Sequence, residues 1–332
     1  MRNFFQFVTF LWPWFFLTIL SAEKIHDGTD DSLVQEIDSS YFKGLEYLAS
    51  SQGEKGVWNE SSYGNQPGVL GMAILAFISR GDDPEFGPYA DAVKKALNAL
   101  LSQQDEKTGF IGKTMYNHGF ACLALAELYG MLNDDRIGLS LKKAVSLIVA
   151  AAKSNPKNAW RYYPDSKDFD TTVSGTQIVA LFAARNAGLS VPNETIEKAL
   201  EVMISCQDSR GGFGYSTSSG ANLPRTSIGS LVLSLAQKTD TESYSKSLEY
   251  LQRNAKYGDQ GHKFYSLYYT AQAMFRANPE MWTEWNERNV KVLLETQQGD
   301  GSWRGNHGTV FSTCSALLSM ALNYRYLPIY ER

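Results

Sequence analysis

The chain has 332 residues and a formal net charge of −4, and 43% of its residues are hydrophobic and 13% aromatic. The charge balance and the lack of a basic run argue against nucleic acid or an anionic membrane surface as a partner. The hydrophobic content predicts a large core, or an apolar cavity as well as a core, within one main domain.

The N-terminus has the pattern of a secretory signal. An apolar stretch at 4–20 contains Pro13 and ends in small residues before Glu23. We therefore expect a signal peptide at 1–22, a flexible segment at 23–36, and a secreted or periplasmic protein. The alternative is an uncleaved anchor, because the stretch approaches the lower limit of ~17 residues for spanning a bilayer. No later segment is long and apolar enough to span, so no membrane span is expected in the mature chain.

A phrase of glutamine, glycine and an aromatic residue recurs along the chain at intervals of about 45 to 52 residues. It reads Q-x-x-x-G-x-W or Q-x-x-x-G-x-F at Gln52–Trp58, Gln207–Phe213 and Gln297–Trp303, and is looser at Gln104–Phe110. The amide can satisfy backbone groups at a helix end, the glycine permits a positive φ, and the ring can cover the polar contact. We interpret this glutamine phrase as a buttress between helical repeats rather than a ligand site.

The spacing of apolar residues between these phrases predicts six pairs of helices. Amphipathic outer helices are predicted at 37–51, 89–103, 138–153, 193–206, 241–253 and 282–296. Inner helices, apolar on nearly all sides and rich in small residues, are predicted at 68–80, 117–130, 171–187, 225–238, 261–276 and 308–322. The phrase has decayed at 155–160 and at Gln252. The alternation predicts one all-α domain at 37–332, in which the helix pairs curl into a barrel.

These phrases, the small-residue inner helices and the sixfold count resemble the squalene cyclase and protein prenyltransferase repeat superfamily. The resemblance extends from about Tyr41 to the end of the chain and implies a single (α/α)6 toroid. The segments YNHGFACLALAE at 116–127, WRYYP at 160–164 and YLPIY at 326–330 look like parts of secreted bacterial prenyltransferase and squalene oxidase repeat proteins. That subgroup implies no particular reaction.

The phrase DFDTTV at 168–173 is the sharpest candidate for catalysis, because it stands where the third inner helix is predicted to begin. It resembles the D-x-D-D-T-A phrase of class II terpene cyclases, in which the middle aspartic acid protonates an alkene or epoxide. The resemblance implies that Asp170 is the general acid and that Asp168 and Thr171 orient it. Thr171 stands where those enzymes have an aspartate, which changes the charge coupling at the acid. The alternative is that Asp168 and Asp170 cap the helix.

Metal and cofactor sites are not predicted. The sequence has no D-x-C phrase, and the spacing of His307 and Cys314 does not match the ligand spacing of protein prenyltransferases, so their zinc site is not expected. Magnesium-diphosphate signatures and glycine-rich phosphate loops are absent as well. The three cysteines, Cys122, Cys206 and Cys314, are expected to be buried as small apolar residues.

Polar and aromatic residues recur at the predicted starts of the inner helices, and in a toroid they would surround one mouth of the central cavity. The candidate ligand-binding residues are Tyr116, His118, Arg225, His262, Tyr265 and His307. The alternative for each histidine is a hydrogen bond to a loop or helix end. The leading hypothesis is an extracytoplasmic toroid that binds a hydrophobic or extended ligand, such as an isoprenoid, or a partner chain. The two other hypotheses are a small class II isoprenoid cyclase with Asp170 as the acid, and a scaffold that docks another protein.

Overall fold

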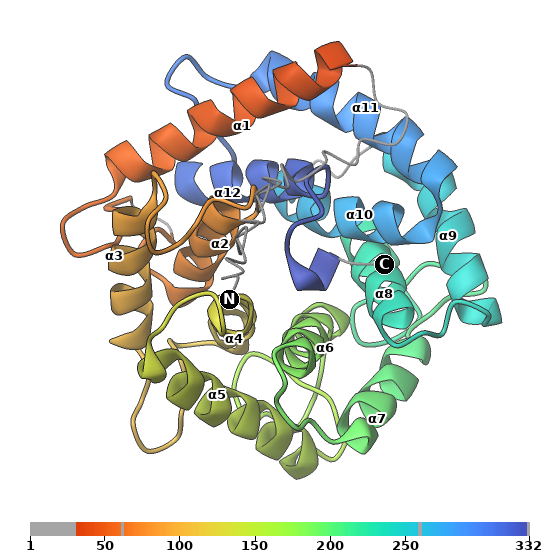
Figure 1. Ribbon diagram of the computed structural model, residues 1–332. Coiled ribbons are helices and arrows are strands. Elements are labelled where there is room, and N and C mark those ends of the chain that lie inside the picture. Colours follow the sequence, from red (N-terminus) through yellow and green to blue (C-terminus); the bar gives the residue numbers. More distant parts are fainter. Residues whose placement is uncertain (1–30, 61–62, 258–260, 331–332) are drawn as a thin grey trace, which may run out of the picture.

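Helices alternate between two concentric rings in the computed structural model, which describes residues 31–60, 63–257 and 261–330 (Figure 1). The outer ring consists of α1 (Asp31–Ser51), α3 (Ala90–Leu101), α5 (Asp135–Ser154), α7 (Asn193–Ile204), α9 (Glu242–Asn254) and α11 (Pro279–Thr296). The inner ring consists of α2 (Pro67–Ile78), α4 (Met115–Leu128), α6 (Thr171–Asn186), α8 (Leu223–Leu235), α10 (Lys263–Ala277) and α12 (Thr309–Ala321). Two short 3₁₀ helices are η1 (Ala255–Tyr257) and η2 (Pro328–Tyr330). Within these residues there is no strand, so the prediction of an all-α toroid of six helix pairs is confirmed.

One predicted boundary was wrong. Helix α1 begins at Asp31, so the last six residues of the segment expected to be flexible at 23–36 are helical. Val34, in the part of α1 that precedes residue 37, is buried, which favours the earlier start of the helix. The predicted signal peptide at 1–22 lies outside the described residues. None of the described helices combines the length and the apolar character needed to cross a bilayer.

The inner helices contact one another in an unbroken cycle, in which α12 returns to α2. Small residues make this close packing feasible. A Cβ atom on Gly175 would lie 2.4 Å from the side chain of Ile228, so the absence of a side chain at this position lets α6 and α8 approach each other. The alternation of the sequence therefore produces a ring with no exposed end repeat.

The glutamine phrases connect consecutive repeats. In each intact copy the glutamine Nε2 donates to the carbonyl of its own phrase glycine and to a carbonyl on the next outer helix. The second acceptors are Ala92 for Gln52, Ser140 for Gln104, Ser243 for Gln207 and Ser40 for Gln297, at 2.8–3.1 Å. The last of these bonds joins α11 to α1 and closes the ring. The tryptophans at the phrase positions share one contact: each is buried, and its Nε1 donates to a carbonyl of the preceding outer helix at 2.8–2.9 Å. The donors are Trp58, Trp160 and Trp303, and the acceptors are Leu48, Ile148 and Leu293.

The glycine of the phrase is required for two reasons. Gly301 has a φ of +87°, and a Cβ atom there would lie 2.2 Å from the carbonyl oxygen of Lys43 on α1. Gly211 has the same relation to Lys246 on α9, with a φ of +91° and a distance of 2.1 Å. Both the left-handed backbone and the close approach of the next outer helix exclude a side chain.

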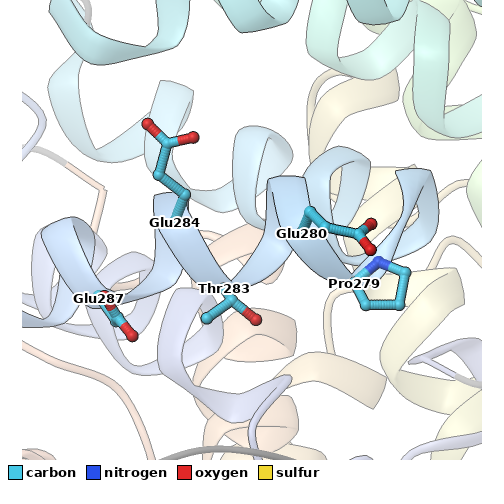
Figure 2. A pocket seen from close by; sticks show the side chains of 5 residues that line it. All are labelled: Pro279, Glu280, Thr283, Glu284 and Glu287. Carbon is cyan, nitrogen blue, oxygen red and sulfur yellow. The ribbon is translucent and has the colours of Figure 1, made fainter.

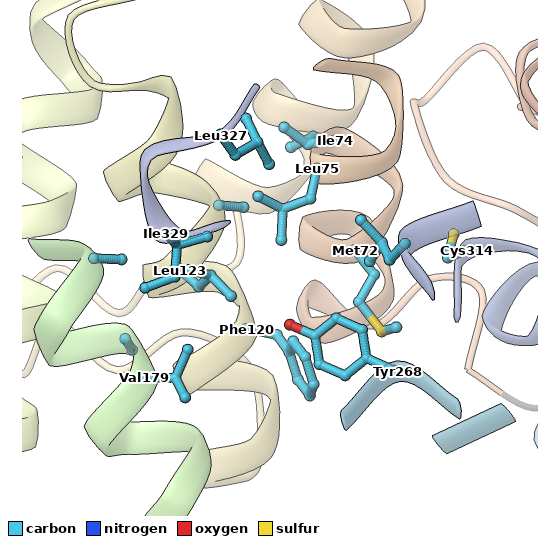
Figure 3. Packing of buried hydrophobic residues seen from close by; sticks show 14 of the residues in the cluster. Met72, Ile74, Leu75, Phe120, Leu123, Val179, Tyr268, Cys314, Leu327 and Ile329 are labelled. Carbon is cyan, nitrogen blue, oxygen red and sulfur yellow. The ribbon is translucent and has the colours of Figure 1, made fainter. Parts of the chain in front are cut away.

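The segment after α12 turns back into the ring, and η2 lies inside it in Figure 1. Leu327, Ile329 and Tyr330 are at most 2% exposed. Figure 3 shows Leu327 beside Ile74 and Leu75 of α2. The chain therefore fills the ring at the end where the inner helices terminate, and we call residues 326–330 the plug segment.

Candidate functional site

The N-terminal ends of the inner helices form the opposite end of the ring, which we call the rim. Contacts between equivalent first turns show that the helices run parallel: Asn117 Oδ1 of α4 accepts from Gly68 N of α2 at 3.1 Å, and Tyr116 Oη of α4 donates to Thr172 Oγ1 of α6 at 2.5 Å. Three of the helices begin with a side-chain cap, from Thr114, Asp170 and Asn222. Because helix N-termini present N–H groups, the rim is polar, while the ring interior behind it is apolar.

Asp170 is the N-cap of α6 and has no exposed surface. Its Oδ1 accepts from the backbone N–H groups of Thr172 and Val173 at 3.0 and 2.8 Å and from Thr172 Oγ1 at 2.6 Å. Its Oδ2 accepts from Tyr215 Oη at 3.2 Å and lies 3.5 Å from Arg161 Nε. Burial raises the pKa of Asp170, although each of these donors acts in the opposite direction. The geometry is that of the capping alternative.

The two residues expected to orient Asp170 have other partners. Asp168 has a largely exposed side chain and pairs with Arg161 Nη1 at 2.8 Å, so it reaches Asp170 only through the shared guanidinium. Thr171 is buried and donates to the carbonyl of Gly214 at 2.8 Å. The threonine that contacts the carboxylate is Thr172. The expected role of Thr171 was therefore wrong, because a side chain one position after an N-cap points away from the cap.

Tyrosine rings extend from the rim into the ring. Tyr162 is 37% exposed, and its ring centroid lies 6.0 Å from that of Tyr116. Tyr116 is followed by Tyr265 at 6.4 Å, and Tyr265 by Tyr269 at 5.1 Å. Tyr269 then meets the buried Tyr268 at 4.8 Å. We call these five residues the tyrosine run. It brings two predicted ligand-binding residues, Tyr116 and Tyr265, into one contact chain.

Two arginines flank the tyrosine that contacts Asp170. The guanidinium carbons of Arg161 and Arg225 lie 5.1 and 5.0 Å from the ring centroid of Tyr215, and Tyr215 Oη lies 2.6 Å from Tyr162 Oη. Arg225 is therefore at the rim as predicted. Sequence reasoning missed Arg161, Tyr162 and Tyr215 as site residues. The WRYYP segment at 160–164 held a signal for the first two, whereas Tyr215 follows a phrase that was interpreted as purely structural.

His118 does not face the rim. It is fully buried, its Nδ1 accepts from Ile111 N at 3.1 Å, and its Nε2 lies 3.0 Å from the carbonyl of Ala144, to which it donates. Burial lowers its pKa to about 4, which keeps the ring neutral. In other repeats a hydroxyl oxygen takes the place of His118 Nδ1 and accepts the equivalent backbone N–H bond. The acceptors are Ser174, Thr226 and Thr313, and the backbone donors are Trp160, Phe213 and Trp303. His118 is thus a repeat buttress, and its expected ligand-binding role was wrong because both ring nitrogens are occupied.

The other two histidines meet each other, His262 at the N-cap of α10 and His307 just before α12. His262 Nδ1 and His307 Nε2 are 3.0 Å apart in nearly parallel rings, and His307 also contacts the rings of Tyr63 and Phe311. The nearby start of α12 is capped by Glu60, whose Oε2 accepts from Thr309 N at 2.9 Å and Val310 N at 3.1 Å.

No arrangement suited to a metal ion is found in the described parts of the chain, where no three His, Cys, Asp or Glu side chains gather. Cys314 is buried in α12, and Cys122 and Cys206 are buried as well. A depression lined by Pro279, Glu280, Thr283, Glu284 and Glu287 lies on α11 of the outer ring (Figure 2). It belongs to the outer surface and contains none of the rim residues.

Comparisons with known proteins support the fold. The sequence matches no protein-family model and no curated protein. The structure is similar to the type II terpene cyclase MstE from Scytonema, with a TM-score of 0.61, 14% identity, and coverage of 89% of this chain and 99% of that one. It is also similar to a family 76 glycoside hydrolase from a bovine Bacteroides thetaiotaomicron strain, with a TM-score of 0.67, 13% identity, and coverage of 88% and 78%. The α-1,6-mannanase GH76A from Salegentibacter sp. HEL1_6 matches with a TM-score of 0.65, 10% identity, and coverage of 86% and 98%. The chain therefore has the terpenoid cyclase-like (α/α)6 toroid fold that its repeats predict.

Proposed function

We propose that this chain is an extracytoplasmic toroid that binds an elongated hydrophobic ligand of isoprenoid type at the rim, and that it does so without cyclase or zinc-dependent chemistry. The proposal rests on a difference between two neighbouring groups at the rim. The carboxylate of Asp170 is enclosed by donors that fix the start of α6, whereas the tyrosine run next to it is reachable from solvent at Tyr162.

The tyrosine run suits an elongated apolar molecule. Its rings pass from the partly exposed Tyr162 to the buried Tyr268, and the plug segment fills the opposite end of the ring. A ligand would therefore enter from the rim and lie along the aromatic rings, which bury large apolar areas at a small entropic cost. Structurally similar toroids hold long molecules: MstE was solved with geranylgeranyl dihydroxybenzoate, and GH76A with α-1,6-mannotetrose.

Binding of geranylgeraniol tests this proposal by calorimetry and by thermal unfolding. We expect Tyr116→Leu to weaken binding about tenfold, or about 1.4 kcal/mol, because it removes a ring, and Tyr116→Phe to bind nearly normally. The matched control is Tyr129→Leu, which changes a 46%-exposed tyrosine that follows the C-terminal end of α4. The proposal fails if geranylgeraniol does not bind, if α-1,6-mannotetrose binds in its place, or if Tyr129→Leu has the same effect as Tyr116→Leu.

A class II cyclase is the second candidate, and one observation favours it. Asp170 is buried with a raised pKa, and Tyr116 Oη donates to Thr172 Oγ1, which in turn donates to Asp170, so hydroxyl groups connect the acid with the tyrosine run. Incubation with a geranylgeranyl substrate and mass-spectrometric analysis distinguishes the candidates. A cyclic product that disappears in Asp170→Asn establishes the cyclase; unchanged substrate in the presence of measurable binding favours the binding protein.

The extracytoplasmic location rests on the leader pattern at 1–22. Terminal sequencing of the protein from its native host tests it. A chain that starts near Glu23 and is recovered outside the cytoplasm is expected. Recovery of the intact leader in the membrane fraction would instead favour the uncleaved anchor.

A further inference from the structure

The plug segment has the form of a bound peptide. Side chains alternate between the wall and solvent: Leu327 and Ile329 are buried, whereas Tyr326 and Pro328 are exposed. Residues 328–330 form the 3₁₀ turn η2, so the segment is a compact turn with three buried side chains, those of Leu327, Ile329 and Tyr330. Its last described residue, Tyr330, is buried and donates its N–H to the carbonyl of Leu327 at 2.8 Å in the η2 turn.

The wall that receives the plug segment belongs to several inner helices. Figure 3 shows Leu327 near Ile74 and Leu75, and Ile329 near Leu123. Helix α6 also contacts η2. These wall side chains lie in the later turns of the inner helices. They are distant in sequence from the plug residues that they contact. The plug segment is thus held by apolar contacts to a concave surface, as a peptide in a groove would be.

One polar anchor fixes the register of the segment. Arg276 Nη2 of α10 donates to the carbonyl of Ile329 at 2.8 Å. A guanidinium that binds a main-chain carbonyl recognises a peptide independently of its side chains, and a bond from a charged donor is stronger than a neutral one. Near the start of the segment, the ring of Tyr326 lies against Gly81, where a Cβ atom would come within 2.9 Å of it.

The inner helices that form the wall also contact one another. The six inner helices already contact one another in a complete cycle, and the glutamine phrases join the repeats around the outside. The plug segment is connected to α12 by Tyr324 and Arg325, which are partly exposed, and Arg325 has a φ of +52° where the chain turns inward. The ring helices therefore have contacts among themselves that do not involve the segment.

We propose that the end of the toroid opposite the rim is a peptide-binding site, which the chain's own plug segment occupies and which accepts the same sequence as a separate peptide. The ligand class is a short peptide that forms such a turn, with two apolar residues at alternate positions and a following aromatic residue, matching Leu327, Ile329 and Tyr330. This site is entered from the end of the ring opposite the rim, and its Tyr330 lies within electrostatic range of Tyr268, the innermost residue of the tyrosine run.

The first experiment separates segment and ring in the folded protein. A specific protease site inserted between Arg325 and Tyr326 is cut, and a fluorescent peptide of residues 326–332 is added in excess. We expect saturable binding by fluorescence anisotropy and displacement by the unlabelled peptide. A control peptide with Leu327→Asp and Ile329→Asp should bind at least 100-fold more weakly, because two buried apolar contacts are replaced by charges. A cut protein that stays folded and neither releases its segment nor binds the peptide overturns the proposal.

The second experiment remains informative if cleavage destabilises the ring. A chain that stops after Arg325 should unfold at a temperature lower by about 5 to 15 °C, and the peptide should restore the loss in a concentration-dependent way. Arg276→Gln in this chain should weaken peptide binding about tenfold, while Arg288→Gln on the outer helix α11 should not. If the shortened chain neither folds nor regains stability at any peptide concentration, the segment is an inseparable part of the core and the proposal is wrong.

Discussion

The junction between α5 and α6 differs from the junctions that carry an intact glutamine phrase. At an intact junction, such as that after α11, Gln297 donates across to the carbonyl of Ser40 on the next outer helix. At the α5–α6 junction the corresponding residue is Asn155, whose Nδ2 donates to the carbonyls of Ser166 and Asp168 in its own loop, at 2.9 and 2.8 Å. The intact phrase joins neighbouring repeats, whereas the altered one shapes a loop.

That loop supplies much of the rim chemistry. It carries Arg161, Tyr162, Asp168 and Asp170, which contact one another or Tyr215. The difference teaches that the repeated phrases of this chain build a scaffold, and that the altered junction contributes side chains to the rim. The following predictions test this division, beginning with the scaffold.

The largest effect is expected at the glycine of an intact phrase. Gly301→Ala should lower the free energy of unfolding by about 3 to 4 kcal/mol, because alanine is strained at a φ of +87° and its Cβ would lie 2.2 Å from the Lys43 carbonyl. Chemical denaturation measures the loss. Gly299→Ala, two residues earlier, is the matched control, since a Cβ there meets nothing within 4 Å, and its change should stay within about 0.5 kcal/mol.

Equal stability of the two variants would show that the closing junction between α11 and α1 does not need the phrase. The difference between intact and altered junctions would then not contribute to the free energy of unfolding. A large loss in Gly301→Ala alone would locate that contribution at the contact with α1.

The next largest effect concerns the buried imidazole. The unfolded chain takes up a proton at His118 near pH 6.5, whereas the folded chain does so only near pH 4. The neutral ring therefore contributes stability that is fully present above about pH 6.5 and is lost as the pH falls toward 4, by up to about 3 kcal/mol. His118→Thr supplies the hydroxyl that Thr226 and Thr313 supply in other repeats, so it should fold and lose this part of the pH dependence.

Other groups also titrate below pH 6.5, so the informative quantity is the difference between the two unfolding curves. At pH 7 the variant should be less stable by about 2 kcal/mol, since it loses the bond to the Ala144 carbonyl and leaves a cavity. At pH 4 the difference should shrink or change sign. A constant difference from pH 7 to pH 4 would contradict the assignment of a neutral structural ring.

Most of the fold could be predicted because its determinants are local and repeated. The glutamine phrase marks four of the six junctions, and the period of the apolar residues distinguishes outer from inner helices. The plug segment could not be derived in this way, because its position depends on contacts between Leu327 or Ile329 and side chains about 200 to 250 residues earlier in the sequence. Periodicity carries no information on such long-range contacts.

The site was only partly predictable. A position at the start of an inner helix correctly places Tyr116 and Arg225 at the rim, but it does not specify the direction of a side chain. His118 also lies near a helix start and turns instead toward the outer ring. Tyr215 was missed because its position depends on how the loop after the Gln207 phrase folds back onto Asp170.

The smallest effect is expected at the altered junction itself. Asn158 occupies the turn with a φ of +53°, a conformation that asparagine tolerates better than other residues with side chains. Asn158→Gly should therefore change the free energy of unfolding by no more than about 0.5 kcal/mol, whereas Asn158→Val should cost about 2 kcal/mol because a β-branched side chain is strained there. If Asn158 serves only to shape the loop, the affinity for geranylgeraniol should be preserved in Asn158→Gly and reduced in Asn158→Val. Lost affinity in a fully stable Asn158→Gly protein would instead assign the asparagine side chain to the ligand.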